Sequence, residues 1–145
     1  MAQQLSITNP WSGDTELSLE LDDSAAIDAK VQASKEASRG WAKTSMRERV
    51  DLVERFIDVA LSERSEIALS ITRQMGKPVS EALGELSTMV ARARMMIGLA
   101  PDALADQHIA LGDGIHRRIV RDPLGVIVDI AAWNYPLLIA GNVVV

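Results

Sequence analysis

The sequence has no cysteine among its 145 residues. Within this chain that absence excludes disulfides, thiolate metal sites and a thiol nucleophile. Aromatic residues are scarce, with three Trp, one Tyr and one Phe. The core must therefore consist mainly of Leu, Ile, Val, Ala and Met side chains. Hydrophobic residues make up 48% of the chain, which is typical of an ordinary globular domain.

Positive charge is in the minority, because 15 Lys and Arg stand against 20 Asp and Glu. This balance disfavours a protein that follows a nucleic-acid backbone. No apolar run reaches the roughly 20 residues that span a bilayer. Residues 1–14 carry neither the basic flank nor the apolar segment of a signal peptide. We therefore expect no nucleic-acid partner, no membrane span and a cytoplasmic location.

Short strand patterns are followed by helical stripes in the first two thirds of the chain. Polar and apolar residues alternate at 5–8 and 17–21, on either side of a turn cluster. Ser45 and Glu48 have the form of a capping box, and Gly76 is a typical residue just after a helix end. Hydrophobic spacings of three and four predict helices over residues 24–41, 45–61, 62–75 and 78–97.

The pattern changes around Pro101. Two alternating arms within residues 109–120 flank the sequence Gly-Asp-Gly, which predicts a β-hairpin. Residues 126–132 are almost continuously apolar and rich in β-branched side chains, as in a strand buried on both faces of a parallel sheet. Pro136 suits the first turn of a helix that follows this strand.

One parallel strand cannot form a sheet by itself, and the sequence contains no second strand of this kind. The closing run at 143–145 has no capping residue after it. We therefore assign the fold class as α/β: N-terminal helices and a hairpin, followed by the first strand, loop and helix of a parallel sheet that is incomplete in this chain. The chain is interpreted as the front end of a larger domain.

Asn134 is the main candidate for chemistry. It lies just after the apolar strand, at the end where open α/β sheets place their ligands. Its amide donates hydrogen bonds without titrating and can stabilise an oxyanion that forms on an attacked carbonyl. The alternative is that Asn134 caps the next helix or shapes the turn. Trp133 beside it can either wall a cofactor pocket or serve only in packing.

Other polar residues are assigned to the surface. No G-x-G-x-x-G occurs, and Lys77 is not part of a phosphate-binding loop, so Gly76-Lys77-Pro78 is expected to be a helix-to-helix turn. Glu81 and Glu85 are expected on a charged helix face. His108 and His116 flank the hairpin without a third ligand at metal-binding spacing, and no metal site is predicted.

A longer pattern occupies residues 121–137, R-D-P-L-G-V-I-V-D-I-A-A-W-N-Y-P-L. It resembles the stretch of NAD(P)-dependent aldehyde dehydrogenases that runs from P-x-G-V through an apolar strand to P-W-N-x-P-L. Residues 74–82 resemble that family's E-x-G-K-P-x-x-E-A segment. Two positions depart from the pattern: Ala132 replaces the usual proline, and Gln74 replaces the usual glutamate. The resemblance covers nearly the whole chain and makes residues 1–145 an N-terminal fragment of the family's Rossmann-like cofactor-binding domain.

The resemblance implies oxidation of an aldehyde, semialdehydes included, to a carboxylic acid with NAD or NADP. Asn134 would donate its amide to the oxyanion of a cysteine thiohemiacetal. Ile130, Ala131, Ala132 and Trp133 would line the nicotinamide side of the cofactor crevice, partly through their backbone. The family's cysteine nucleophile and general-base glutamate come later in its sequence, so this fragment alone is expected to be inactive.

The hairpin at 107–120 matches the arm through which subunits of the family pair, which implies a homo-oligomer. An alternative from another class is a naturally truncated, non-catalytic interaction module that pairs with full-length dehydrogenase subunits through the same hairpin. The uncapped apolar run at 137–145 disfavours this alternative, because an exposed run of this kind promotes aggregation.

Overall fold

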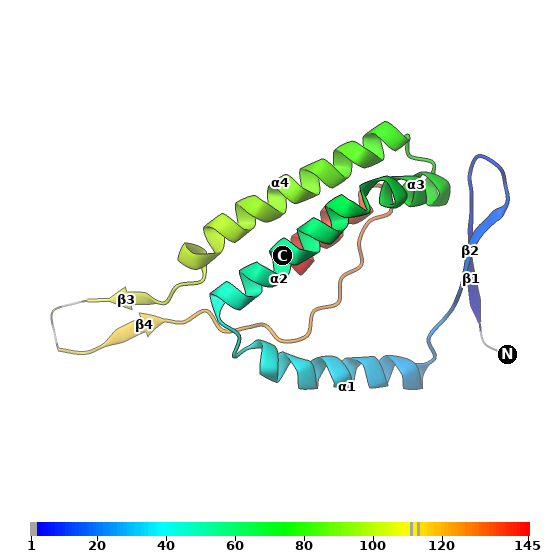
Figure 1. The fold of residues 1–145 in the computed structure, drawn as a ribbon. Helices are drawn as coiled ribbons and strands as arrows, with labels where there is room; N and C mark the ends of the chain where they lie inside the picture. Colours follow the sequence, from blue (N-terminus) through cyan, green and yellow to red (C-terminus); the bar gives the residue numbers. More distant parts are fainter. Residues whose placement is uncertain (1–2, 111, 113) are drawn as a thin grey trace.

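The computed structural model describes residues 3–110, 112 and 114–145 (Figure 1). Helices occupy the middle of this chain, and a two-stranded antiparallel hairpin lies on each side of them in the sequence. Among the described residues no helix combines the length and the apolar character needed to cross a membrane. The elements are β1 (Gln4–Thr8), β2 (Thr15–Glu20), α1 (Ser24–Trp41), α2 (Met46–Ser62), α3 (Arg64–Met75), α4 (Val79–Ala103), β3 (Gln107–Ile109), β4 (Arg117–Ile119) and α5 (Pro136–Val144).

The first hairpin confirms the alternating pattern and its turn. β1 and β2 pair from Gln4 opposite Glu20 to Ile7 opposite Leu17. In the turn, Gly13 adopts a positive φ of 78°, which glycine reaches without steric cost. Figure 1 shows this hairpin next to the end of α3.

The predicted helix boundaries hold where capping residues set them. The Ser45 side chain accepts a hydrogen bond from the Glu48 backbone N–H, and the Glu48 side chain accepts one from the Ser45 backbone N–H, so the capping box is confirmed at the start of α2. Gly76 ends α3 in the left-handed region with φ 80°. In contrast, α4 is longer than expected: it continues through Pro101 to Ala103.

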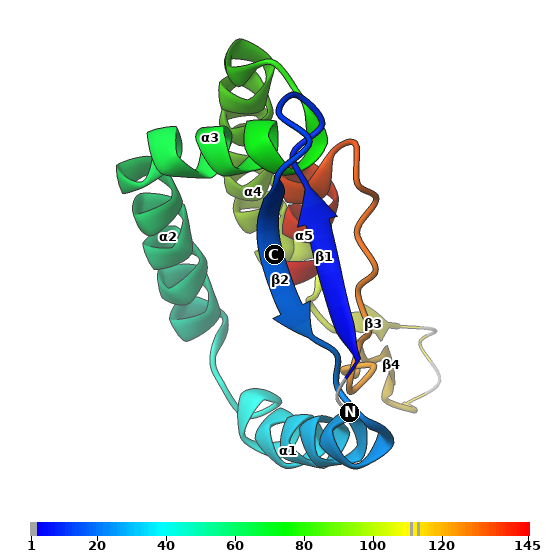
Figure 2. The same ribbon diagram turned by 90° about the vertical axis from the view of Figure 1, so that its right-hand side faces the viewer.

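The core lies where α2, α3, α4 and α5 meet. Ile57 and Leu86 are its largest fully buried side chains. Gly141 brings α5 close to α4, since a Cβ at this position would lie 2.7 Å from Met89 Cγ. Figure 2 shows α5 beside α4, with α1 lying apart at the other end of the molecule. The remaining core residues are small or aliphatic, in two clusters: Ala60, Met89, Val90 and Ala93, and then Ala68, Ile71 and Ala82.

The strand predicted over 126–132 is not formed. Residues 121–132 have neither helix nor strand structure, and Ile130 is 89% exposed. Figure 1 shows this segment running from β4 to α5 without a strand paired to it. The physical reason is that a strand needs hydrogen-bond partners on its edges, and the described part of the chain supplies no neighbouring strand.

The pairing of the second hairpin is confirmed, while Asp113 of its predicted Gly-Asp-Gly turn lies outside the described residues. β3 and β4 pair in antiparallel register, with His108 opposite Arg118 and Ile109 opposite Arg117. A hydrogen-bonded ion pair joins Arg118 Nη1 to Asp106 Oδ2 over 3.1 Å at its base. Figure 1 shows the hairpin projecting beyond the helices, and most of its side chains are exposed.

Candidate functional site

Asn134 lies in the turn between the extended segment and α5. The turn covers Trp133 to Tyr135, and Pro136 then opens the helix at its first position, as predicted. Asn134 is exposed. Within the described residues no hydrogen bond engages its side-chain amide, so that group is not the cap of α5. The residue at the N-cap position is Tyr135, and it also makes no side-chain capping bond.

The cap of α5 comes from a distant helix. Glu85 on α4 accepts hydrogen bonds at Oε1 from the backbone N–H groups of Leu137 (2.9 Å) and Leu138 (3.1 Å). These donors belong to the first turn of a helix, which has no partners of its own for them. A carboxylate at this end also interacts favourably with the helix dipole.

Lys77 completes this arrangement from the α3–α4 junction. Its Nζ forms a hydrogen-bonded ion pair with Glu85 Oε2. The same Nζ donates to the backbone oxygen of Asn134 over 2.6 Å. It also lies 4.1 Å from the centroid of the Tyr135 ring, within the range of a cation–π contact. We call the pair Lys77 and Glu85 the clamp.

The clamp is buried. The Glu85 side chain is 0% exposed and the Lys77 side chain is 7% exposed. Burying two charges is costly unless their remaining donors and acceptors are satisfied. Here both oxygens of Glu85 have partners, and no buried side-chain nitrogen or oxygen among the described residues lacks one. The two buried charges are therefore compensated by their ion pair and by hydrogen bonds to backbone groups at the start of α5 and in the turn before it.

The prediction that Glu85 lies on the surface is wrong. Lys77 does lie in the predicted turn between two helices, but it also takes part in a buried ion pair. One signal in the sequence could have located Glu85. It falls on the stripe formed by Ala82, Leu86 and Met89, which is the buried face of α4. A carboxylate on a buried stripe needs partners, but the pattern does not say where along the chain they lie.

The four residues predicted to meet a cofactor lie directly before Asn134. All are exposed, and Trp133 is 75% exposed. Two alanines separate the larger isoleucine and tryptophan side chains, so a ligand can come close to the backbone at this point. The set is Ile130, Ala131, Ala132 and Trp133.

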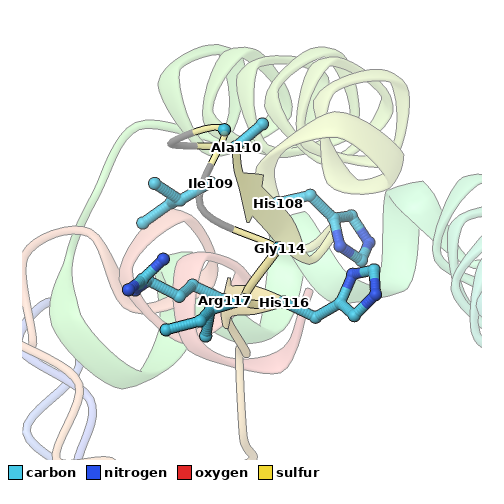
Figure 3. A pocket seen from close by; sticks show the side chains of 8 residues that line it. His108, Ile109, Ala110, Gly114, His116 and Arg117 are labelled. Atoms are coloured by element: carbon cyan, nitrogen blue, oxygen red, sulfur yellow. The ribbon is translucent and has the colours of Figure 1, made fainter.

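The β3–β4 hairpin contains a separate hollow of about 300 Å³. Figure 3 shows the imidazoles of His108 and His116 side by side on one face of the hairpin, while Ile109 and Arg117 point to the other. Both histidines are exposed, as predicted. Within residues 3–110, 112 and 114–145 no group of three or more potential ligands is suited to a metal ion.

The same arrangement of elements occurs in a solved dehydrogenase. The structure of an enzyme assigned as methylmalonate-semialdehyde dehydrogenase from Sinorhizobium meliloti 1021, complexed with NAD, matches with a TM-score of 0.88. The two sequences are 25% identical, and the match covers 96% of this chain and 28% of the other. The fold is therefore that of the opening part of a dehydrogenase subunit.

The chain belongs to the aldehyde dehydrogenase family, whose model matches residues 1–145. N-succinylglutamate 5-semialdehyde dehydrogenase 1 of Caulobacter vibrioides is 29% identical over 99% of this chain and 32% of its own length. Succinate-semialdehyde dehydrogenase (NADP+) of Deinococcus radiodurans is 31% identical over 89% of this chain and 27% of its own length. The resemblance and the α/β fold class predicted from the sequence are thus confirmed. The chain spans about a third of the length of these relatives.

Proposed function

We propose that this chain is the N-terminal part of an enzyme that oxidises an aldehyde to a carboxylic acid with NAD or NADP. Membership of the aldehyde dehydrogenase family supports this reaction class. The names of two relatives point to semialdehydes as the substrate class. One relative is named for NADP, and one solved relative contains NAD. Residues 1–145 would form part of the cofactor-binding domain.

The observation that carries the proposal is the position of Asn134. Its backbone is tied to the buried clamp through a 2.6 Å hydrogen bond, while its side chain remains exposed. An oxyanion donor needs this combination of a fixed backbone and an available amide, because stabilisation depends on donors that are already in place when charge develops. The helix-capping alternative is disfavoured because Glu85 supplies the cap.

In the proposed mechanism a cysteine thiolate from outside residues 1–145 adds to the aldehyde carbon. A C–S bond forms and the carbonyl electron pair moves to oxygen. Asn134 donates its amide N–H to this oxyanion and lowers the barrier to its formation. NAD or NADP, when bound, supplies the chemistry of hydride acceptance. Loss of hydride from the thiohemiacetal carbon would leave a thioester, and water would then break its C–S bond to release the carboxylic acid and the free thiol. Because residues 1–145 contain no thiol, they are expected to catalyse no oxidation by themselves.

The residues before Asn134 suit the cofactor. The exposed side chains of Ile130 and Trp133 offer an apolar surface on which a nicotinamide ring can pack. Ala131 and Ala132 allow close approach to the backbone. We place the nicotinamide side of the crevice at Ile130, Ala131, Ala132 and Trp133.

The hairpin at 107–120 would join subunits into a homo-oligomer. Among the described residues β3 and β4 form a sheet of two strands, and a strand at the edge of a sheet can pair with a strand of another chain. Ile109, Ile119 and Val120 are exposed apolar residues within or next to this hairpin. Apolar side chains together with an open strand edge suit association with a second subunit.

The test uses the polypeptide as its own cell produces it. Its intact mass comes first, since a mass well above 15.7 kDa supports an enzyme with further catalytic residues, and a mass of 15.7 kDa supports the truncated interaction module. In the larger protein, reduced cofactor is then followed with succinic semialdehyde as substrate. Asn134→Ala should lower kcat by roughly 10²–10³-fold. Asn142→Ala, the same change at an exposed site on α5, is the control. Unchanged turnover in a folded Asn134→Ala protein removes Asn134 from the mechanism.

A further inference from the structure

Helix α5 is held to α4 in two places along its length. At one place the Glu85 carboxylate binds the N–H groups of Leu137 and Leu138. At the other, Gly141 packs closely against Met89, since a Cβ at this position would lie 2.7 Å from Met89 Cγ and the Met89 side chain would have to shift. A helix fixed along its length in this way gives the preceding turn a defined point of attachment.

The turn itself is held by Lys77. Its ammonium group bonds Glu85 Oε2 and the Asn134 backbone oxygen, and it faces the Tyr135 ring. A hydrogen bond to the Asn134 oxygen fixes the peptide plane between Asn134 and Tyr135. The orientation of the backbone that carries the Asn134 side chain is therefore constrained by a residue 57 positions away in the sequence.

A role in stability alone does not account for these contacts. A buried ion pair contributes little net stability compared with apolar side chains of similar volume. Here, however, every bond outside the pair is made to backbone groups of residues 134–138. Oxyanion donors lose much of their effect when displaced by about 1 Å. The geometry therefore suits a group that positions another.

We infer that Lys77 and Glu85 are positioning residues, which hold the Asn134 turn so that its amide meets the oxyanion. This inference rests on the proposed function of Asn134. Lys77 and Glu85 do not touch the reacting atoms in this arrangement. Their effect passes through the backbone oxygen of Asn134 and through the capped first turn of α5.

The test is steady-state kinetics of the whole protein with succinic semialdehyde and its preferred cofactor. Lys77→Met and Glu85→Gln should each lower kcat by roughly 10- to 100-fold, while the KM for the cofactor changes less than about twofold. Glu81→Gln is the matched control, because this exposed residue lies one turn earlier on α4. It should keep wild-type kcat.

A variant that removes both charges distinguishes the loss of positioning from a loss of folding. In Lys77→Met/Glu85→Met no charge is left unpaired in the core, so the folded protein should be retained. The turn nevertheless loses its bonds, and kcat should still fall by roughly 10- to 100-fold. Wild-type kcat in this folded double variant would overturn the inference, since the bonds to the turn would then be dispensable.

A double-mutant cycle separates this inference from the proposed function. If the clamp acts through Asn134, adding Lys77→Met to Asn134→Ala should cause no further fall in kcat. Losses that multiply would instead assign Lys77 a separate role and contradict the inference. If Asn134→Ala alone leaves kcat unchanged, both proposals fail. If Asn134→Ala lowers kcat but the clamp variants do not, only the positioning inference fails.

Discussion

Lys77 Nζ lies 2.6 Å from the backbone oxygen of Asn134, although the two residues are 57 positions apart in the sequence. This contact links the junction between α3 and α4 to the turn that precedes α5. It places a buried charge directly behind an exposed amide. The proposed site therefore includes the residues that support Asn134 as well as Asn134 itself.

Trp133→Ala should weaken cofactor binding more than turnover. The proposal places the exposed Trp133 ring against the nicotinamide, so removing it takes away apolar contact area but leaves the Asn134 amide in place. We expect the KM for NAD or NADP to rise roughly tenfold, equivalent to about 1.4 kcal/mol, with little change in kcat. The control is Trp11→Ala in the β1–β2 turn, where the side chain is also exposed. Equal effects of the two variants would contradict this role of Trp133.

Gly76→Ala should destabilise the protein. Gly76 has a φ of 80°, and a Cβ there would lie 2.9 Å from Pro10 Cγ. The left-handed backbone alone costs a non-glycine residue about 1–2 kcal/mol, and displacement of the β1–β2 turn adds to this. The apparent Tm should fall. Gly84→Ala is the control: it is a helical glycine, and among the described residues no atom outside its own helix backbone lies within 4 Å of the added Cβ, so the change should stabilise by about 0.5–1 kcal/mol. The idea fails if both substitutions shift Tm in the same direction.

Features set by neighbouring residues could be predicted from the sequence. The capping box depends on Ser45 and Glu48, three residues apart, and the end of α3 depends on Gly76 alone. The start of α5 at Pro136 is of the same kind, because proline fixes φ and lacks the N–H that a first turn leaves unpaired. Asn134 was identifiable as a candidate because it follows an apolar segment directly.

Features set by distant partners could not be predicted. The apolar stripe of α4 includes Glu85, but nothing in the local pattern shows that the partners of its carboxylate lie at 137 and 138. The segment 126–132 has the composition of a buried strand, but strand formation requires neighbouring strands that the described chain does not contain. In both cases the deciding interaction involves residues far from the pattern itself.

The capping box should make α2 sensitive to acid. The pKa of Glu48 is lowered from its ordinary value of 4.5, chiefly by the hydrogen bond from the Ser45 backbone N–H and then by the bond to the Ser45 side chain. A lowered pKa in the folded state means that the ionised carboxylate stabilises the helix above its unfolded pKa. This contribution is lost as the pH falls through the lower folded value.

Circular dichroism of a peptide covering residues 43–63 provides the measurement. Its helicity should fall as the pH drops from about 5 to 2. Glu48→Gln is the matched control, because an amide keeps the bond to the Ser45 N–H without titrating. The remaining acidic residues titrate in both peptides, so the difference between the two curves reports Glu48. Identical curves would show that the Glu48 carboxylate has no part in the acid response. Ser45→Ala should lower helicity at every pH, at a cost of about 1 kcal/mol.

The two faces of the β3–β4 hairpin should differ in their effect on assembly. Side chains alternate between the faces of a strand, so the register places Ile109 and Ile119 on one face and His108 and Arg118 on the other. The proposed subunit contact uses the face of Ile109 and Ile119, which also carries Arg117, and an added lysine would have to lose its hydration there. Ile109→Lys should therefore shift the protein to a smaller species in sedimentation velocity, while His108→Lys on the opposite face leaves the assembly intact. Dissociation by His108→Lys alone would place the contact on the histidine face, and an unchanged mass in both variants would place the subunit interface away from this hairpin.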